Sequence, residues 1–329
     1  MIANNVLEPL DRKIVGALQV NGRAGWRRIA AVIDAPERTV AAHGTELVRR
    51  GIVRMTGLTL LPQGGVLSSA IASVRCVMGM NRITATAAAD RPSTVFTYLT
   101  TGDNDCVFEL MSERSRTLSV ILDEVPSLPG IASAETATIL KLYKGTHQWL
   151  PGILSDDQVA ALTDGEQSWE PTGSIELAPL SREEQEIARV LGIDGRATIE
   201  ELARATALSA ASARRRLAHL QASGRLFDRA VIEPAALGFP VEAILRIRTR
   251  PGSTEAVARQ LAQTPEVRYL AFLTGRYQLF VDVACVSEAT LADFLMHAPW
   301  NEAALEVETS LVLRALKRSS VRMDDRAHS

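Results

Sequence analysis

The chain repeats itself at an offset of 173 residues without a gap, and this repeat constrains the fold more than any other feature of the sequence. Four pairs of stretches share the register: NGRAGWRRIA (21–30) with DGRATIEELA (194–203), ELVRRGIV (46–53) with HLQASGRL (219–226), LTTGDND (99–105) with FLTGRYQ (272–278), and ETATIL (135–140) with ETSLVL (308–313). Chance could supply one such match, but four in one register predict a tandem duplication. We expect one unit at about 9–144 and a second at about 180–318.

Each unit begins with three short helical patterns. In the second unit, Ser181, Thr198 and Ser209 stand directly before the three apolar periodicities, where N-cap residues are expected. The stretch LFDRAVIEP (226–234) then alternates enough to predict a strand. Three helices followed by such a strand indicate a winged helix-turn-helix. The first unit repeats this plan, and its third helix is expected at 36–50.

The second half of each unit predicts a strand, a helix, two strands, a helix and a strand, which is the order of a ferredoxin-like βαββαβ domain. An open sheet of this kind needs a cover on the face that its helices leave free. The sheet of the other unit would supply that cover, so we expect an α+β protein whose two sheets pair as a pseudo-dimer. The expected domains are a winged helix-turn-helix at 9–60, a ferredoxin-like domain at 66–144, a linker at 145–179, a second winged helix-turn-helix at 180–232, a second ferredoxin-like domain at 239–318 and a tail at 319–329.

Charge is distributed unevenly along the chain, although the formal net charge is only −2. Residues 1–60 carry nine Lys and Arg against five Asp and Glu, whereas residues 61–180 carry seven against fourteen. A surface that binds a polyanion would therefore be local, and the first segment is one candidate. Neither a secretory signal nor an apolar stretch of membrane-spanning length is found, so we expect a soluble, cytoplasmic protein with no membrane partner.

The third helix of the second unit carries three consecutive arginines in the stretch SARRRLAHL (212–220). At 100° per residue, the apolar side chains form one stripe, and Arg214 lies to the side. The outward face, an arc of roughly 100°, is formed by Ser212, Arg215, Arg216 and His219. Arginine matches guanine or phosphate, and serine and histidine can bond to either. We therefore predict that this face binds double-stranded DNA, the alternative being a solvated helix face.

The corresponding arc in the first unit, which includes Thr39, His43 and Glu46, holds no arginine. Basic residues cluster around this arc instead. The candidate DNA contacts of the first unit are therefore Thr39 and His43 on the arc, together with the nearby Arg23, Arg27, Arg28 and Arg38. Two interpretations stay open: the first unit binds mainly phosphate, which we favour because of its positive charge, or it has become structural. Arg196 occupies the position of Arg23 in the second unit and is a further candidate, although an arginine at a helix end is as often a capping partner.

The order DRKI, GR, ELVRRGIV, EPAALGFP and TG, together with a winged helix-turn-helix before βαββαβ, resembles the Lrp/AsnC family of bacterial and archaeal transcription regulators. The resemblance covers nearly the whole chain except the linker and the tail. It implies a sequence-specific DNA-binding regulator whose effector domain senses an amino acid or another small metabolite. Most members carry one unit and dimerise, so this chain would form homo-oligomers from intrachain pseudo-dimers.

In the family, the TG turn lies near the effector pocket between paired domains. The resemblance therefore implies as effector-binding residues Thr101, Gly102, Asp103 and Asp105 in one unit and Thr274, Gly275, Arg276 and Tyr277 in the other. An α-amino acid needs an acid for its ammonium group and a donor for its carboxylate, so a composite pocket could join Asp103 or Asp105 with Arg276. The alternative is two solvated hairpin turns in which glycine supplies a positive φ.

An enzyme is the less favoured reading, because the sequence holds none of the motifs that mark common phosphate, metal or nucleophile sites. We expect no catalytic residue, no metal and no cofactor. A scaffold or an enzyme derived from the same fold, similar to the siroheme decarboxylases, remains the alternative. The sequence contains no histidine-rich motif that would mark the pocket of such an enzyme.

Overall fold

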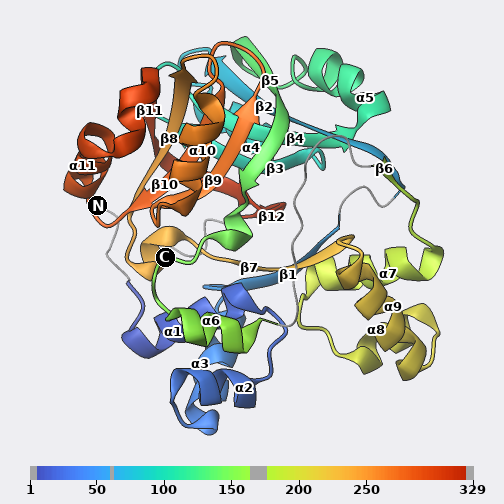
Figure 1. Cartoon of the computed structure of the whole chain (residues 1–329). Coiled ribbons are helices and arrows are strands. Elements are labelled where there is room, and N and C mark those ends of the chain that lie inside the picture. The colour runs from blue at the N-terminus through green and yellow to red at the C-terminus, as the bar shows by residue number, and fades with distance from the viewer. Residues whose placement is uncertain (1–5, 60–62, 164–175, 324–329) are drawn as a thin grey trace.

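The computed structural model describes residues 6–59, 63–163 and 176–323, and the chain adopts a mixed α+β architecture (Figure 1). Helices and strands occur in the same order twice. The first half contains α1 (Pro9–Val20), α2 (Trp26–Ile33), α3 (Glu37–Arg49), β1 (Arg54–Thr59), β2 (Gly65–Cys76), α4 (Asn81–Ala89), β3 (Thr94–Thr100), β4 (Cys106–Glu113), α5 (Arg114–Ser119) and β5 (Ile131–Lys144). The second contains α7 (Arg182–Ile193), α8 (Ile199–Thr206), α9 (Ala210–Ala222), β7 (Leu226–Val231), β8 (Val241–Thr249), α10 (Thr254–Gln263), β9 (Val267–Leu273), β10 (Leu279–Cys285), α11 (Glu288–His297) and β11 (Ala304–Arg318).

Helices α1–α3 and α7–α9 form two helical units, each with its own apolar core. The predicted N-caps of the second unit are confirmed, because the hydroxyls of Ser181, Thr198 and Ser209 accept hydrogen bonds from backbone N–H groups three residues later. A side-chain acceptor satisfies a donor that the first helical turn leaves free, which fixes where each helix begins. In α9 the apolar stripe is buried, with Ala213 and Leu220 nearly inaccessible.

The two βαββαβ segments do not form two separate open sheets, as the sequence suggested, but one closed barrel. Its strands follow the order β11-β3-β4-β2-β5-β9-β10-β8, and β8 pairs again with β11. Closure is possible because β5 and β11 are long, with 14 and 15 residues, and reach the other half. There β5 pairs with β9 and β11 with β3. Closing the sheet removes the free strand edges that an open sheet would expose.

Aromatic side chains from both halves fill the barrel interior. Phe96 stacks on Tyr98 with ring centroids 4.7 Å apart and lies 6.0 Å from Phe280. Tyr269 meets Phe280 edge-on at 6.1 Å. Offset and edge-to-face pairs of this kind are the favoured aromatic geometries. The core therefore belongs to both halves at once.

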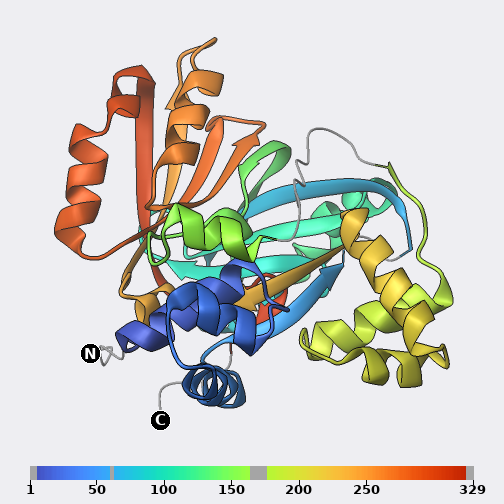
Figure 2. The ribbon, with the colours of Figure 1, turned by 60° about the horizontal axis from the view of Figure 1, so that its bottom comes forward.

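Strands β1 and β7 pair with each other in an antiparallel two-stranded ribbon, from Arg54 opposite Val231 to Thr59 opposite Leu226. In Figure 1 this ribbon lies between the barrel above and the two helical units below. Figure 2 brings the helical units forward and shows that they sit side by side on the same side of the barrel. The ribbon thus joins the helical units to each other and to the barrel.

The segment between the two halves packs on the first helical unit. Its helix α6 (Asp156–Leu162) lies against α1 and α2, and Leu162 is fully buried in the core of that unit. Trp149 is 2% exposed and donates a hydrogen bond from Nε1 to the Pro265 carbonyl at 2.9 Å. The apolar residues Trp149 and Leu162 of this linker are therefore part of the hydrophobic core. Within the described residues, no helix has the length and apolar character to cross a bilayer.

Candidate functional site

Helix α9 presents the candidate DNA-binding face of the second helical unit. Arg215 and His219 are exposed, and neither side chain has a hydrogen bond or ion pair with any residue that the structure describes. The Ser212 hydroxyl accepts a hydrogen bond from the hydroxyl of the N-cap Ser209 at 3.0 Å. Cationic side chains without a protein partner on an exposed helix are available to a polyanion.

Arg216 does not join this exposed face in the structure. Its Nη1 donates to the Ser181 hydroxyl at 3.2 Å, and its Nη2 lies 3.8 Å from a Glu183 carboxylate oxygen. These groups begin α7, so the side chain turns toward the neighbouring helix. Arg214, which helical geometry placed to the side, is as exposed as Arg215 and has no partner among the described residues. The free cations of α9 are therefore Arg214 and Arg215.

Helix α3 of the first helical unit is largely engaged with its own unit. His43 Nδ1 lies 2.7 Å from an Asp11 carboxylate oxygen on α1, and Arg49 donates twice to Glu46, at 2.7 and 2.6 Å. Two cations nearby, Arg27 on α2 and Arg38 on α3, are exposed and have no partner in the described part of the chain, whereas Thr39 is half-buried.

Arg23 and Arg196 join the two helical units, contrary to their prediction as DNA contacts. Arg23 donates to the carbonyls of Gly195 and Ala197 at 2.6 and 2.7 Å. Arg196 donates to the carbonyls of Gly22 and Ala24 at 2.8 and 3.1 Å. The two sets of hydrogen bonds are reciprocal. The arginines and the residues whose carbonyls accept from them occupy equivalent positions in the two halves, 173 residues apart. Each guanidinium group thus binds carbonyl oxygens in the turn between the first and second helices of the opposite unit.

One further contact strengthens this junction. The Arg196 guanidinium lies 4.2 Å from the centroid of the Trp26 ring, a cation–π distance. Burial and the neighbouring Arg23 lower the pKa of Arg196.

Arg28, another predicted DNA contact, donates from Nε and Nη2 to the Ala161 carbonyl at the end of α6, at 3.1 and 2.7 Å. It therefore anchors the linker helix.

The two TG turns serve barrel closure. The Thr101 hydroxyl accepts the Leu311 N–H at 2.9 Å, and the Thr274 hydroxyl accepts the Thr138 N–H at 2.9 Å. Each turn thereby links its own half to the long strand of the other half. Gly102 and Gly275 have φ values of 87° and 97°, as expected for hairpin glycines.

The structure gives the residues of the predicted composite pocket, Asp103 or Asp105 with Arg276, separate partners. The carboxylate of Asp103 lies 3.3 Å from Arg75. Asp105 accepts from the Cys76 N–H at 2.7 Å and from the Asn81 side-chain amide at 2.9 Å. In the other turn, a Glu306 oxygen accepts from Arg276 at 2.5 Å and from the Tyr277 hydroxyl at 2.9 Å. Each turn is neutralised by its own neighbours.

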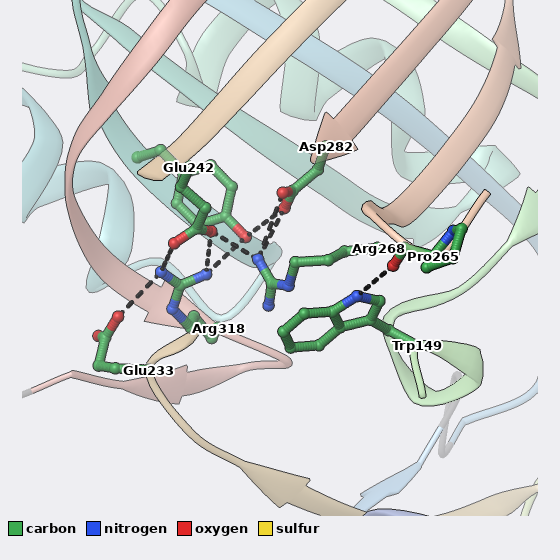
Figure 3. A network of polar contacts seen from close by, with 8 residues as sticks. Trp149, Glu233, Glu242, Pro265, Arg268, Asp282 and Arg318 are labelled. Carbon is green, nitrogen blue, oxygen red and sulfur yellow. Dashed lines mark hydrogen bonds and ion pairs between the residues drawn. The ribbon is translucent and has the colours of Figure 1, made fainter. Parts of the chain in front are cut away.

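A buried charge network closes one side of the barrel mouth (Figure 3). Arg268 lies 2.5 Å from Glu242 and 3.2 Å from Asp282, and Arg318 bonds Glu242 through both nitrogens at 2.7 and 2.6 Å. Arg318 also reaches Glu233 at 2.9 Å. Burial raises the pKa of Asp282 to about 6 in spite of the adjacent Arg268. Such a paired cluster is stable only while all its members are present.

Beside this network lies a cavity of about 170 Å³. Its walls come from the barrel, the β1–β7 ribbon and the start of the linker, and its charged lining includes Glu109 and Arg229. We name it the mouth cavity. Sequence reasoning missed it, because Glu109 stands in an otherwise apolar strand and Arg229 in a stretch predicted as a wing. A single acid within CVFEL was the only local signal.

Comparison with known proteins fits this arrangement. The Lrp/AsnC ligand binding domain matches residues 242–321. The HTH-type transcriptional regulator FL11 of Pyrococcus horikoshii is 30% identical over 141 residues, which are 43% of this chain and 93% of that protein. The chain belongs to the Lrp/AsnC family. FL11 of Pyrococcus furiosus is 28% identical over 142 residues, again 43% of this Lrp/AsnC protein and 94% of the relative.

One solved structure resembles this Lrp/AsnC protein over almost its whole length. The crystal structure of the siroheme decarboxylase NirDL superposes with a TM-score of 0.59 and covers 97% of this chain and 96% of its own. The same enzyme with an iron-uroporphyrin III analogue gives a TM-score of 0.58. Sequence identity is 16% in both cases, so the similarity concerns the fold.

Proposed function

We propose that this protein is a sequence-specific DNA-binding transcription regulator built by tandem duplication, with one winged helix-turn-helix in each helical unit. The observation that carries this proposal is the exposed face of α9. Arg214, Arg215 and His219 lie there without a partner in the described residues, on the third helix of a three-helix unit. In a winged helix-turn-helix, that helix enters the major groove. The names of the FL11 relatives support the same function.

The first helical unit contributes mainly phosphate contacts in this proposal. Arg27 and Arg38 are exposed and unpaired within the described chain, while His43 and Glu46 are engaged by Asp11 and Arg49. Exposed arginines supply affinity that depends on salt and not on sequence. The two helical units lie on one side of the barrel (Figure 2), so both can face one duplex.

DNA selected from a random pool tests the proposal. Arg215→Ala should weaken binding by about 1–3 kcal/mol and relax the preference at one base position. Arg38→Ala should weaken binding on all sequences equally and reduce the salt slope by about one. Arg259→Ala is the matched control, because this exposed arginine lies on α10 and pairs with Glu255 at 2.9 Å. Unchanged affinity in both DNA-face variants would contradict the proposal.

An enzyme of the siroheme decarboxylase type is the second candidate, favoured by the whole-chain superposition on NirDL. The mouth cavity argues for a smaller guest. At about 170 Å³ it is close to an engineered cavity of about 150 Å³ that holds benzene, whereas a cyclic tetrapyrrole joins four pyrrole rings in one macrocycle and is much larger than benzene. Titration with an iron-uroporphyrin, followed by its absorption band, should show no saturable shift. A stoichiometric shift would favour the enzyme.

A further inference from the structure

We propose that Arg23 and Arg196 are positioning residues, which hold the candidate DNA-binding helices α3 and α9 at one fixed separation, so that both helical units contact a single duplex at one fixed distance along it. We call their four reciprocal hydrogen bonds the arginine junction. The DNA part of this inference rests on the proposed function, whereas the fixed separation is a property of the protein alone.

The arginine junction lies one helix away from each candidate DNA-binding helix. Arg196 binds carbonyls in the turn directly before α2. Arg23 binds carbonyls in the turn directly before α8. Helix α2 packs against α3, and α8 packs against α9. Each arginine therefore holds the opposite unit at the start of the helix pair that would meet DNA.

Trp26 connects the arginine junction to α3. It is the first residue of α2, and its ring receives the Arg196 guanidinium at the cation–π distance of 4.2 Å. A Cβ atom at Gly44, in the middle of α3, would lie 2.4 Å from a carbon of the Trp26 ring, so the ring packs directly against the helix backbone. The residue that receives a cation from the second unit thus touches the third helix of the first unit.

Asp228 connects the arginine junction to α9. The side-chain amide of Gln221, near the end of α9, donates to the Asp228 carboxylate at 2.7 Å. Asp228 lies on β7 beside Gly22, where a Cβ atom would come within 3.3 Å of the Asp228 Cβ atom. Burial raises the pKa of Asp228, and the nearby Arg23 guanidinium partly offsets this rise. The end of α9 and the turn of the first unit therefore meet at one carboxylate.

These contacts form one continuous path between the two candidate DNA-binding helices. Its hydrogen bonds run in both directions between the units, so a change in separation or in angle would break bonds in both turns at once. The ribbon adds a further restraint, because the Gly195 N–H donates to the Met55 carbonyl at 2.9 Å. A hinge requires an interface with few contacts. The two helical units therefore move as one body.

A fixed separation has a direct consequence for bound DNA. The two units lie on one side of the barrel (Figure 2), and a duplex repeats about every 10–10.5 base pairs. The unit that carries α3 would then meet the duplex at one distance from the bases that α9 contacts. Because α3 contributes mainly phosphate contacts in the proposed function, this distance is visible as protected backbone and not as a second base sequence.

Electron paramagnetic resonance on the full chain without DNA tests the separation. Spin labels on Thr45→Cys and Ala218→Cys report the distance between α3 and α9, since both positions are exposed and lie 173 residues apart. Cys76→Ser removes the one native thiol that is not buried. We expect a single narrow distance distribution. A broad or multiple distribution would overturn the proposal.

Two junction variants test the cause of the narrow distribution. Arg196→Lys keeps the charge but lacks the planar fork, and it should broaden the distribution about twofold. Arg23→Ala combined with Arg196→Ala should broaden it further. The control is Arg189→Ala, an exposed arginine on α7 that pairs with Glu186, and should leave the width unchanged. Circular dichroism checks that each variant keeps its helices. An unchanged width in both junction variants would overturn the proposal.

Hydroxyl-radical footprints on DNA selected from a random pool test the consequence. The natural chain should protect two backbone tracts at one fixed distance, and Arg38→Ala identifies the tract that belongs to α3. Arg196→Lys should weaken protection of that tract at least threefold while the tract of α9 keeps its protection, a split that a general loss of stability would not produce. Equal protection of both tracts in Arg196→Lys would overturn the proposal.

Failure of the proposed function has a different signature. If the natural chain protects no DNA, the DNA part of the inference falls with the proposed function, and the spin-label distances still decide whether the arginine junction fixes α3 and α9. If the natural chain protects only the tract of α9, DNA binding stands and the joint placement of the two units is overturned.

Discussion

The guanidinium groups of Arg23 and Arg196 satisfy four carbonyl oxygens between the helical units. Hydrogen bonds to a charged group contribute about 1.5–3 kcal/mol, and their loss leaves the carbonyls of the opposite unit without a donor. Arg23→Ala should therefore lower the free energy of unfolding by about 2–3 kcal/mol, measured by urea denaturation. Arg204→Ala, on an exposed arginine of α8, should change it little.

This prediction also separates the two roles that were considered for Arg23. A DNA contact would show the opposite pattern, with unchanged unfolding and weaker DNA binding in Arg23→Ala. Arg196→Ala should destabilise at least as much as Arg23→Ala, because it also removes the contact with the Trp26 ring.

Glu109 makes the stability of the protein depend on pH. Its pKa is raised to about 8 in the folded chain by burial, against 4.5 as its ordinary value. The folded state therefore holds a proton that the unfolded chain releases, so stability is greatest below about pH 4.5 and falls as pH rises toward 8. The slope reaches about 1.4 kcal/mol per pH unit in this window.

Denaturation at pH 5, 7 and 9 measures this slope. Glu109→Gln cannot ionise, so its stability relative to the natural chain should improve as pH rises. Glu186→Gln is the control at an exposed ion pair and should leave the slope unchanged. A Glu109→Gln profile parallel to that of the natural chain would contradict the assignment.

At the scale of elements, Gly195 holds the second helical unit against the β1–β7 ribbon. A Cβ atom at this position would lie 2.6 Å from the Thr56 nitrogen and 2.8 Å from the Met55 carbonyl carbon, both backbone atoms that cannot rotate away. Overpacking of this kind costs about 1–3 kcal/mol. Gly195→Ala should destabilise by that amount. Gly192→Ala, whose Cβ would meet only a carbonyl oxygen at 3.8 Å, should be neutral or stabilising in thermal melts.

Local sequence patterns predicted the helices and strands well, but they could not predict which strands from distant parts of the chain pair with each other. Ser209 could be placed as an N-cap because the acceptor and its donor are three residues apart. The pairings of β5 with β9 and of β1 with β7 depend on strands from different halves, and no local pattern specifies them.

The candidate site divides in the same way. Arg215 and His219 could be assigned to the exposed face from helical geometry alone. Arg216 could not, because its partner Ser181 lies 35 residues earlier, and the partners of Arg23 lie more than 170 residues away. The mouth cavity is formed by segments of the barrel, ribbon and linker that only the tertiary fold brings together.

At the scale of the whole molecule, one barrel built from both halves fixes two different helical faces on the same side (Figure 2). A symmetric dimer of identical chains would offer two equal faces and favour a palindrome, since operator symmetry follows protein symmetry. Here α9 offers Arg214 and Arg215, whereas the arc of α3 offers no arginine. We therefore expect selection from random DNA to yield asymmetric sites with a dominant half.

A graft of the α9 face onto α3 tests the cause of that asymmetry. The residues 173 positions apart from Ser212, Arg214, Arg215 and His219 define the changes: Thr39→Ser, Ala41→Arg, Ala42→Arg and Glu46→His. His43 is kept because it contacts Asp11. If the helix faces set the operator, the grafted chain should select sites with two similar half-sites, and affinity for the natural site should fall. Palindromes selected by the natural chain, or unchanged asymmetry after the graft in a chain that unfolds normally, would show that the difference between the two faces does not determine what is bound. In that case the first helical unit serves the junction through Arg23 and not the recognition of DNA.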